Sequence, residues 1–302
     1  MPEILIENMG TGYGDIRIWQ DVNLAITEPG LVGILGPNGV GKSTLMYTIN
    51  KILPPTEGKV SINGMDVTEL DYKDIAKIVA YVPQASNETF AMTVLDTVMM
   101  GRYPVSGFTT SEDDVRIATR CLKVMGITDL AMRNFNELSA GQHQKVMIAR
   151  GLAQEPQILM LDEPTSNLDI YHQIYVMKLL RDIAKANGII VLVICHDLNV
   201  ASKFCDRLIL LSNGKVASDG TSNEVITAEN IRDVYNVNAE VQEVDGRPYV
   251  VYHSDESVDA DTTLVFSRSK DGSEESQAAK GLGSIFGKRQ HSRSSKISLE
   301  TP

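Results

Sequence analysis

The chain has 302 residues, 43% of them apolar, which is enough to bury one large core or one core carrying an inserted lobe. Its formal net charge of −11 argues against a nucleic-acid partner, because phosphate backbones require clustered Lys and Arg. Three cysteines (Cys121, Cys195 and Cys205) show no C-x-x-C spacing, so reduced structural thiols of a cytosolic chain are expected.

The N-terminal segment lacks the pattern of a targeting peptide. MPEILIENMG is acidic and has none of the basic, apolar and small-residue regions of a signal peptide. The longest apolar run, Ile189–Cys195, is far shorter than the ~20 residues that cross a bilayer. We therefore expect the chain in the aqueous phase, with any membrane role borrowed from another chain.

Three short apolar runs without polar alternation predict buried parallel strands. They are Leu31–Leu35, Ile158–Leu161 and Ile189–Ile194, and each leads into a turn and a helical pattern, so α/β is the natural fold class. Two segments, Lys59–Val67 and Leu208–Gly220, carry Asn-Gly between alternating residues, which is typical of antiparallel hairpins. The sequence thus predicts a mainly parallel sheet with an antiparallel β flank.

The segment after the first apolar run fits G-x-x-x-x-G-K-[ST] and precedes a predicted helix over Ser43–Asn50. Glycines let successive backbone N–H groups curl around phosphate oxygens, and the helix N-terminus adds a positive dipole end. Lys42 is expected to reach the β- and γ-phosphates of ATP, and the Ser43 hydroxyl to ligate Mg²⁺. The residues predicted to bind nucleotide here are Gly36, Pro37, Asn38, Gly39, Gly41, Lys42, Ser43 and Thr44.

Between about residues 87 and 157 the pattern becomes mostly helical, and strand-type sequence resumes at Ile158. Within it, Val94, Leu95, Val98 and Met99 fall on one helical face. This interruption predicts a helical subdomain inserted into the α/β core.

The apolar run that begins at Ile158 ends in two carboxylates, Asp162 and Glu163. The alternative is a strand that simply ends in charged residues. Beside a phosphate loop, however, the two carboxylates can take separate roles. Asp162 can hold Mg²⁺ through water, and Glu163 can polarise the attacking water. His196 ends the next apolar run, at the strand edge where ligands of such sheets collect. The alternative is that His196 is only structural, but its position beside the phosphate loop favours a contact with the γ-phosphate.

From about Asp255 the chain becomes Ser-rich and sparse in large apolar residues, with a basic cluster at Lys288–Lys296. Such a composition cannot offset the entropy of ordering, so residues 255–302 are predicted to form a disordered tail. The basic cluster leaves open a contact with anionic lipid.

Leu138-Ser139-Ala140-Gly141-Gln142 resembles the L-S-G-G-Q signature of the ABC ATPases, with Ala140 in place of the first glycine. Gln84 in YVPQ resembles the family's Q-loop. Ser166–Asp169 resembles its D-loop, with Asn167 where Ala is commoner. His196 matches the switch histidine, and Tyr13 resembles the aromatic residue that stacks on adenine.

The motifs keep the family's order and spacing from about Ile4 to Val251. The resemblance implies an ABC ATPase domain over residues 1–254, with a P-loop NTPase core and the helical subdomain at about 87–157. It gives catalytic roles to Glu163, His196, Gln84 and Lys42. It assigns Mg²⁺ to Ser43, Gln84 and Asp162. It adds Tyr13, Ser139, Gly141, Gln142 and Asp169 to the residues that bind ATP.

The resemblance also implies a head-to-tail dimer, in which one chain's phosphate loop and the other chain's Ser139 and Gly141 hold each ATP. One phosphate loop and one signature per chain suggest a homodimer, or pairing with a separate ATPase subunit. A helix N-terminus after a Ser-Ala-Gly turn can donate to an anion, which agrees with this arrangement.

Two stretches carry a finer resemblance. Thr93–Pro104 and Cys195–Gly220 are similar to segments of importers for iron–siderophores, haem and cobalamin. This implies two transmembrane permease subunits, an external substrate-binding protein, and a peripheral position on the cytoplasmic face of the membrane. We expect Arg102 and Tyr103 to be exposed where a permease helix docks, and the alternative is that this stretch is only helix core.

Two further functions compete with transport. A soluble ABC ATPase of translation or DNA repair usually carries two cassettes or a long coiled-coil insertion, and neither is visible here. A regulatory subunit without turnover would be expected to lack Glu163 or His196, and both are present. An ATPase of another transporter class, such as an exporter, also stays open.

Overall fold

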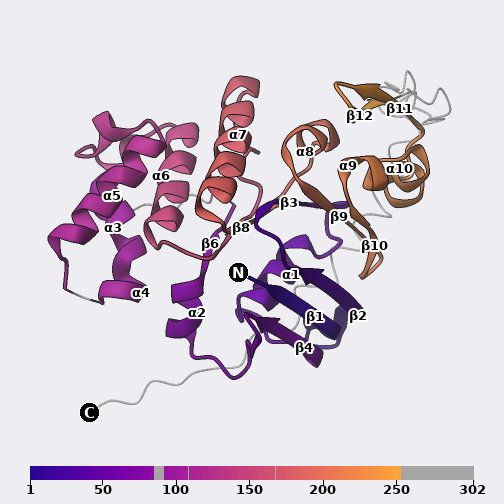
Figure 1. The fold of residues 1–302 in the computed structure, drawn as a ribbon, viewed down its shortest axis with the longest axis horizontal. Coiled ribbons are helices and arrows are strands. Elements are labelled where there is room, and N and C mark those ends of the chain that lie inside the picture. Colours follow the sequence, from indigo (N-terminus) through magenta and orange to yellow (C-terminus); the bar gives the residue numbers. More distant parts are fainter. Residues whose placement is uncertain (85–91, 108, 167, 253–302) are drawn as a thin grey trace, which may run out of the picture. The chain divides into compact units, whose positions relative to one another are not determined.

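The computed structural model describes residues 1–84, 92–107, 109–166 and 168–252. Its central element is a six-stranded sheet with the order β10-β9-β3-β8-β7-β6 (Figure 1). Its strands pair in parallel, except that β10 runs antiparallel to β9 at one edge. The predicted α/β class with a mainly parallel sheet is confirmed. The strands are β3 (Gly30–Leu35), β6 (Val79–Val82), β7 (Ile158–Leu161), β8 (Ile190–Ile194), β9 (Arg207–Ser212) and β10 (Lys215–Gly220).

In the described part of the chain, two antiparallel sheets accompany the central one. The larger has the order β2-β1-β4-β5, and the smaller pairs β11 with β12. The predicted Lys59–Val67 hairpin is β4–β5, and its Asn63-Gly64 turn has positive φ at both residues. The predicted Leu208–Gly220 hairpin also forms, but its first strand, β9, pairs with β3 and so belongs to the parallel core. The strands are β1 (Ile4–Tyr13), β2 (Ile16–Ile26), β4 (Glu57–Ile62), β5 (Met65–Asp66), β11 (Ala239–Val244) and β12 (Arg247–Tyr252).

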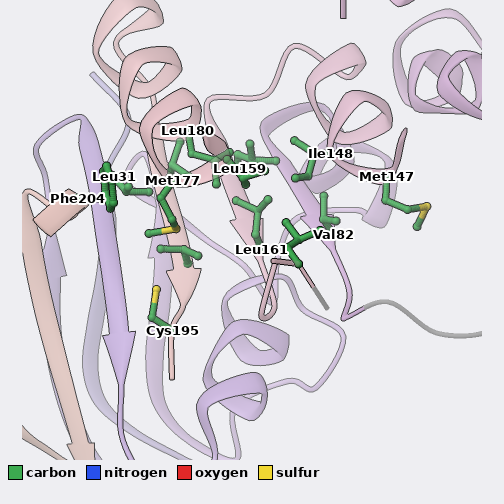
Figure 2. Packing of buried hydrophobic residues seen from close by; sticks show 14 of the residues in the cluster. Leu31, Val82, Met147, Ile148, Leu159, Leu161, Met177, Leu180, Cys195 and Phe204 are labelled. Carbon is green, nitrogen blue, oxygen red and sulfur yellow. The ribbon is translucent and has the colours of Figure 1, made fainter. Parts of the chain in front are cut away.

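Strands β3, β7 and β8 are apolar or glycine and buried at every position, because both faces of the sheet are covered there. On β7, Leu159 and Leu161 enter one hydrophobic cluster, and Met160 enters the other. This alternation follows from the two-residue period of a strand. Figure 2 shows part of the first cluster, with Leu159 between the helical residues Leu180 and Ile148, and with Leu161 beside Val82. The buried sheet thereby fixes the position of the carboxyl ends of its strands, where the polar residues of the candidate site begin.

Helices replace strands between β6 and β7, as the sequence pattern indicates. Figure 1 shows these helices gathered beside the sheet, and α3, α5 and α6 pack on one another. Val94 and Val98 on α3 are fully buried, which confirms the apolar face. The predicted start of this segment, near residue 87, lies outside the described residues. The elements are α3 (Val94–Met99), η1 (Met100–Arg102), α4 (Tyr103–Ser106), α5 (Glu112–Val124), η2 (Thr128–Leu130), η3 (Phe135–Glu137) and α6 (Ala140–Ala153).

The expectation that Arg102 is exposed is wrong. Its side chain is only 7% exposed, and its Nε lies 2.9 Å from Oδ1 of Asp114, which is also buried. Its Nη1 donates to the carbonyl of Ala153 at 2.7 Å and lies 2.9 Å from Oε2 of Glu155. A guanidinium has five donors in a planar fork, so it can join three acceptors at once. Arg102 therefore ties η1 to α5 and α6, whereas Tyr103 is half-exposed as expected.

The remaining helices flank the sheets and connect their strands. None of the helices in the described ranges has the length and hydropathy needed to cross a bilayer. The proposed tail, residues 255–302, lies outside the described part of the chain. These helices are α1 (Lys42–Ile49), α2 (Tyr72–Ile78), α7 (Ile170–Asn187), α8 (Leu198–Phe204), α9 (Ser222–Val225) and α10 (Ala228–Tyr235).

Candidate active site

The predicted phosphate loop connects buried strand β3 to helix α1, which begins at Lys42. Gly39 and Gly41 have φ values of +78° and +104°, in the region that favours glycine. A Cβ at Gly39 would meet nothing within 4 Å, whereas one at Gly41 would lie 2.5 Å from Cγ2 of Ile18. Gly41 is therefore required both by its backbone conformation and by the close approach of β2.

Trp19 contacts the phosphate loop through a hydrogen bond, and the sequence did not predict it as a site residue. This residue is 1% exposed, and its indole Nε1 donates to the carbonyl of Gly41 at 3.1 Å. The bond joins β2 of the antiparallel sheet to the N-terminus of α1. Trp19 is the chain's single tryptophan, and its place in a strand pattern gives no signal of this partner.

Lys42 lies inside the loop rather than in solvent. It is 6% exposed, and its Nζ donates to the carbonyls of Gly36 at 2.8 Å and Pro37 at 2.9 Å. Burial lowers the pKa of Lys42, and the nearby carboxylates of Glu163 and Asp162 oppose that shift. The arrangement concentrates a cation where a phosphate chain would enter the loop.

The two carboxylates that end β7 have different environments. Asp162 is 5% exposed, whereas the Glu163 side chain is 19% exposed and faces partners from other elements. Gln84 Nε2 donates to Oε2 of Glu163 at 2.7 Å, and Nε2 of His196 contacts its Oε1. Three residues predicted to be catalytic thus meet at the carboxyl ends of β6, β7 and β8.

A cavity of about 450 Å³ unites the loop with this carboxylate cluster. Its lining combines backbone N–H groups at a helix N-terminus with a buried cation, which suits a triphosphate. Asn38 reaches the cavity too, but Tyr13, half-exposed at the end of β1, is not among its lining residues. The lining consists of Ile18, Asn38, Gly39, Gly41, Lys42, Ser43, Thr44, Gln84, Glu163 and His196.

The donor set also fits Mg²⁺. This ion takes oxygen ligands and is commonly held by one or two carboxylates together with substrate phosphates. Ser43 and Gln84 line the cavity, and Asp162 is close enough to Lys42 to influence its pKa. Hydroxyl, amide and carboxylate oxygens are therefore present in the neighbourhood that the sequence predicted.

The signature residues lie at a second cavity, of about 370 Å³. Ser139 caps helix α6, its side chain accepting from the N–H of Gln142 while Oε1 of Gln142 accepts from the N–H of Ser139. The helix begins at Ala140, so Gly141 lies within its first turn rather than in a preceding turn as expected. The signature therefore presents a true helix N-terminus.

The Asp169 carboxylate caps α7 at the same cavity. It accepts from the backbone N–H of His172 at 2.8 Å and lies 2.9 Å from its Nδ1. These bonds, the backbone one first, lower the pKa of Asp169. His172 and Lys145 also line this cavity and were not identified from the sequence, because each is an ordinary polar position on a helix face.

Comparison with known proteins agrees with this geometry. A family model described as ABC transporter matches residues 19–166. The chain is 44% identical over 246 residues to the uncharacterized ABC transporter ATP-binding protein MJ0089 of Methanocaldococcus jannaschii, spanning 82% of this chain and 96% of that protein. It is 38% identical over 243 residues to the iron(3+)-hydroxamate import ATP-binding protein FhuC of Bacillus subtilis, spanning 80% and 90%.

A solved structure of a metal-chelate type ABC transporter in an inward-facing conformation matches with a TM-score of 0.72 and 28% identity. The match spans 84% of this chain and 98% of that chain. Fold, phosphate loop and overall similarity agree, and they confirm the resemblance noted in the sequence. The chain belongs to the ATP-binding proteins of ABC transporters, and it is an ATPase of that family.

Proposed function

We propose that this ATPase hydrolyses MgATP as one half of a head-to-tail dimer and powers a membrane importer of metal chelates. The observation that supports the dimer is the separation of two half-sites. Within the described residues, the cavity at the phosphate loop and the cavity at the signature share no lining residue. Each chain thus offers a phosphate cradle at one cavity and an anion-binding helix N-terminus at another. Two copies arranged head to tail would complete both.

In this proposal the loop and Tyr13 bind ATP, and Lys42 neutralises the β- and γ-phosphates. Glu163 orients the attacking water. A carboxylate has about four acceptor positions, so Glu163 can bind a water while Gln84 and His196 fix its orientation.

His196 and the partner's signature helix then stabilise the charge that spreads over the γ-phosphoryl oxygens. Ser43, Asp162 and Gln84 would hold Mg²⁺, which when bound neutralises charge between the β- and γ-phosphates. Gln142 and Asp169 shape the signature half of the site.

The importer class is supported by similarity and by an exposed surface. FhuC is by name an import ATP-binding protein for iron(3+)-hydroxamate, and the structural neighbour is of metal-chelate type. Among the described residues from 92 to 107, four large apolar side chains are 37–51% exposed. They are Met92, Met100, Tyr103 and Val105.

We assign this surface to a short cytoplasmic helix of the permease. In this arrangement two permease subunits and an external binding protein complete the importer, with the ATPase peripheral on the cytoplasmic face. The chelates considered are an iron–siderophore, haem and cobalamin.

Reconstituted uptake tests the proposal. The chain is purified with its two permease subunits, placed in proteoliposomes, and supplied with MgATP and each labelled chelate in turn. Uptake of one chelate class is expected. Uptake of none, with ATPase activity that responds instead to nucleic acid or ribosomes, would favour a soluble ABC ATPase.

A pair of variants tests the docking surface. Val105→Asp places a charge on the exposed surface of α4, away from the nucleotide cavity. The ATPase activity of the isolated chain is expected to stay within twofold of wild type, while assembly with the permease and uptake fall. Val244→Asp on β11, exposed to a similar degree, is the control and should leave both intact. Normal uptake by Val105→Asp would remove this surface from the proposal.

A further inference from the structure

Tyr81 lies beside Asp162 on the neighbouring strand of the central sheet. β6 and β7 run parallel with Val82 opposite Leu161, and the N–H of Asp162 donates to the carbonyl of Val82 at 2.9 Å. The Tyr81 hydroxyl donates to Oδ2 of Asp162 at 3.2 Å. The backbone register therefore brings the phenol to the carboxylate, although the two residues are 81 positions apart.

The Asp162 carboxylate needs a hydrogen-bond donor because it is almost excluded from solvent. It is 5% exposed, and an ionised carboxylate removed from water is costly unless hydrogen bonds compensate it. The Tyr81 hydroxyl supplies one such hydrogen bond from the neighbouring strand.

Tyr47 holds Tyr81 in this position. The two rings pack edge to face, with centroids 5.7 Å apart and planes at 78°, an arrangement that aromatic pairs favour. Tyr47 belongs to α1, the helix whose first turn carries Ser43. A chain of contacts therefore joins the elements that carry Ser43 and Asp162.

We propose that Tyr81 is a positioning residue for magnesium, fixing one oxygen of Asp162 while Tyr47 holds its ring. The inference rests on the proposed magnesium role of Asp162. Partners that donate to metal-binding carboxylates orient them, and their loss commonly weakens metal affinity about 10–100-fold. Tyr81 itself touches neither nucleotide nor metal in this arrangement.

Tyr81→Phe tests the role, because it removes the hydroxyl and keeps the ring. Mn²⁺ replaces Mg²⁺ as a probe, and its binding to the full chain with ADP is followed by electron paramagnetic resonance. We expect the Kd for Mn²⁺ to rise about tenfold. Nucleotide affinity in EDTA should stay unchanged, and kcat should recover at high Mg²⁺. Tyr175→Phe, whose hydroxyl contacts the carbonyl of Val124 on α5, is the matched control and should leave Mn²⁺ binding unchanged.

The outcomes separate this inference from the function on which it rests. An unchanged Mn²⁺ Kd in Tyr81→Phe, with weakened binding in Asp162→Asn, overturns the role of Tyr81 alone. Unchanged binding in both variants contradicts the magnesium role of Asp162. Equal loss of nucleotide affinity with and without metal in Tyr81→Phe shows a merely structural role. If Tyr81→Phe does not fold, Tyr47→Leu replaces it, and a smaller rise in the Mn²⁺ Kd is expected.

Discussion

Glu163 combines backbone strain with two side-chain contacts. Its φ is +48°, a left-handed conformation that costs a residue other than glycine roughly 1–3 kcal/mol and is concentrated at functional sites. Gln84 and His196 contact its two carboxylate oxygens from adjacent strand ends. Glu163 lines the cavity at the phosphate loop, and these two contacts fix the orientation of its carboxylate there.

Glu163→Gln is expected to keep ATP binding and to lose hydrolysis by a factor of at least about 10². The amide preserves the side-chain shape but accepts no proton from water. Turnover is measured by phosphate release, and ATP affinity by equilibrium binding. Glu69→Gln, at an exposed position, is the control. Hydrolysis near the wild-type rate in Glu163→Gln would assign the water to another residue.

Some site residues could be predicted from the sequence next to them, and others could not. The loop from Gly36 to Thr44, the carboxylates after β7 and His196 could be predicted because each follows an apolar strand in the sequence. Trp19 and Tyr81 could not, since their hydrogen bonds to Gly41 and Asp162 span 22 and 81 residues. Such bonds depend on which strands become neighbours, and hydrophobic periodicity does not specify that order.

At the scale of elements, the burial of Arg102 likewise depends on packing that the neighbouring sequence does not specify. The importer resemblance predicted that Arg102 is exposed where a permease helix docks, but Arg102 is buried against Asp114. Ser111 and Asp114 form a capping box at the start of α5, and this pattern is visible in the sequence. That Asp114 also receives Arg102 depends on the packing of α5 beside η1. The central strands, by contrast, could be predicted from their own composition.

The Arg102–Asp114 pair leads to a stability prediction. Arg102→Met leaves a buried carboxylate without its cation, so we expect the melting temperature to fall by roughly 10 °C at pH 7. The exposed pair Arg17–Glu57 supplies the control, and Arg17→Met should change the free energy of unfolding by less than about 1 kcal/mol. A variant at Arg102 as stable as wild type would contradict the structural role.

The pair also predicts a pH dependence. Hydrogen bonds from Ser106, Arg102 and Ser111 hold the pKa of Asp114 below its usual value. The folded chain therefore binds fewer protons here than the unfolded chain around pH 4. The stabilisation is complete above the unfolded pKa and is lost as pH falls below it. Urea titrations at pH 3, 4 and 7 should show a shallower acid dependence in Arg102→Met than in wild type.

At the scale of the whole molecule, the cavity at the phosphate loop and the cavity at the signature are separate within each chain. The loop cavity carries Lys42, Glu163 and His196, and the signature cavity carries Ser139 and Asp169. The residues around Gly141 do not by themselves reveal a role across an interface. A helix N-terminus looks the same whether the anion that it binds is held by its own chain or by another. The separation of the two cavities supports the second copy that the resemblance implies.

Mixing two inactive variants tests that separation. Lys42→Ala removes the buried cation of the loop, and losing one such preorganised charge commonly lowers the rate by ~10²–10³. Ser139→Arg fills the signature cavity with a long side chain and removes the α6 cap. Each variant alone should be inactive. A mixed dimer, however, contains one composite site with an intact loop from one chain and an intact signature from the other.

Activity should therefore reappear on mixing, up to the level that a single intact site supports. Differently tagged chains are copurified first, so that mixed dimers are known to form in the presence of ATP. Mixing two tagged Lys42→Ala preparations is the control, because every site in that dimer lacks the loop cation and should stay inactive. Recovery in the mixture and not in the control is what shared sites require. If mixed dimers form and activity stays absent, either both sites must be intact for turnover or the signature does not act in trans. The affinity for labelled ATP decides between these, since the mixed dimer should bind ATP more tightly than the Ser139→Arg chain alone only when the other chain's signature contributes to the site.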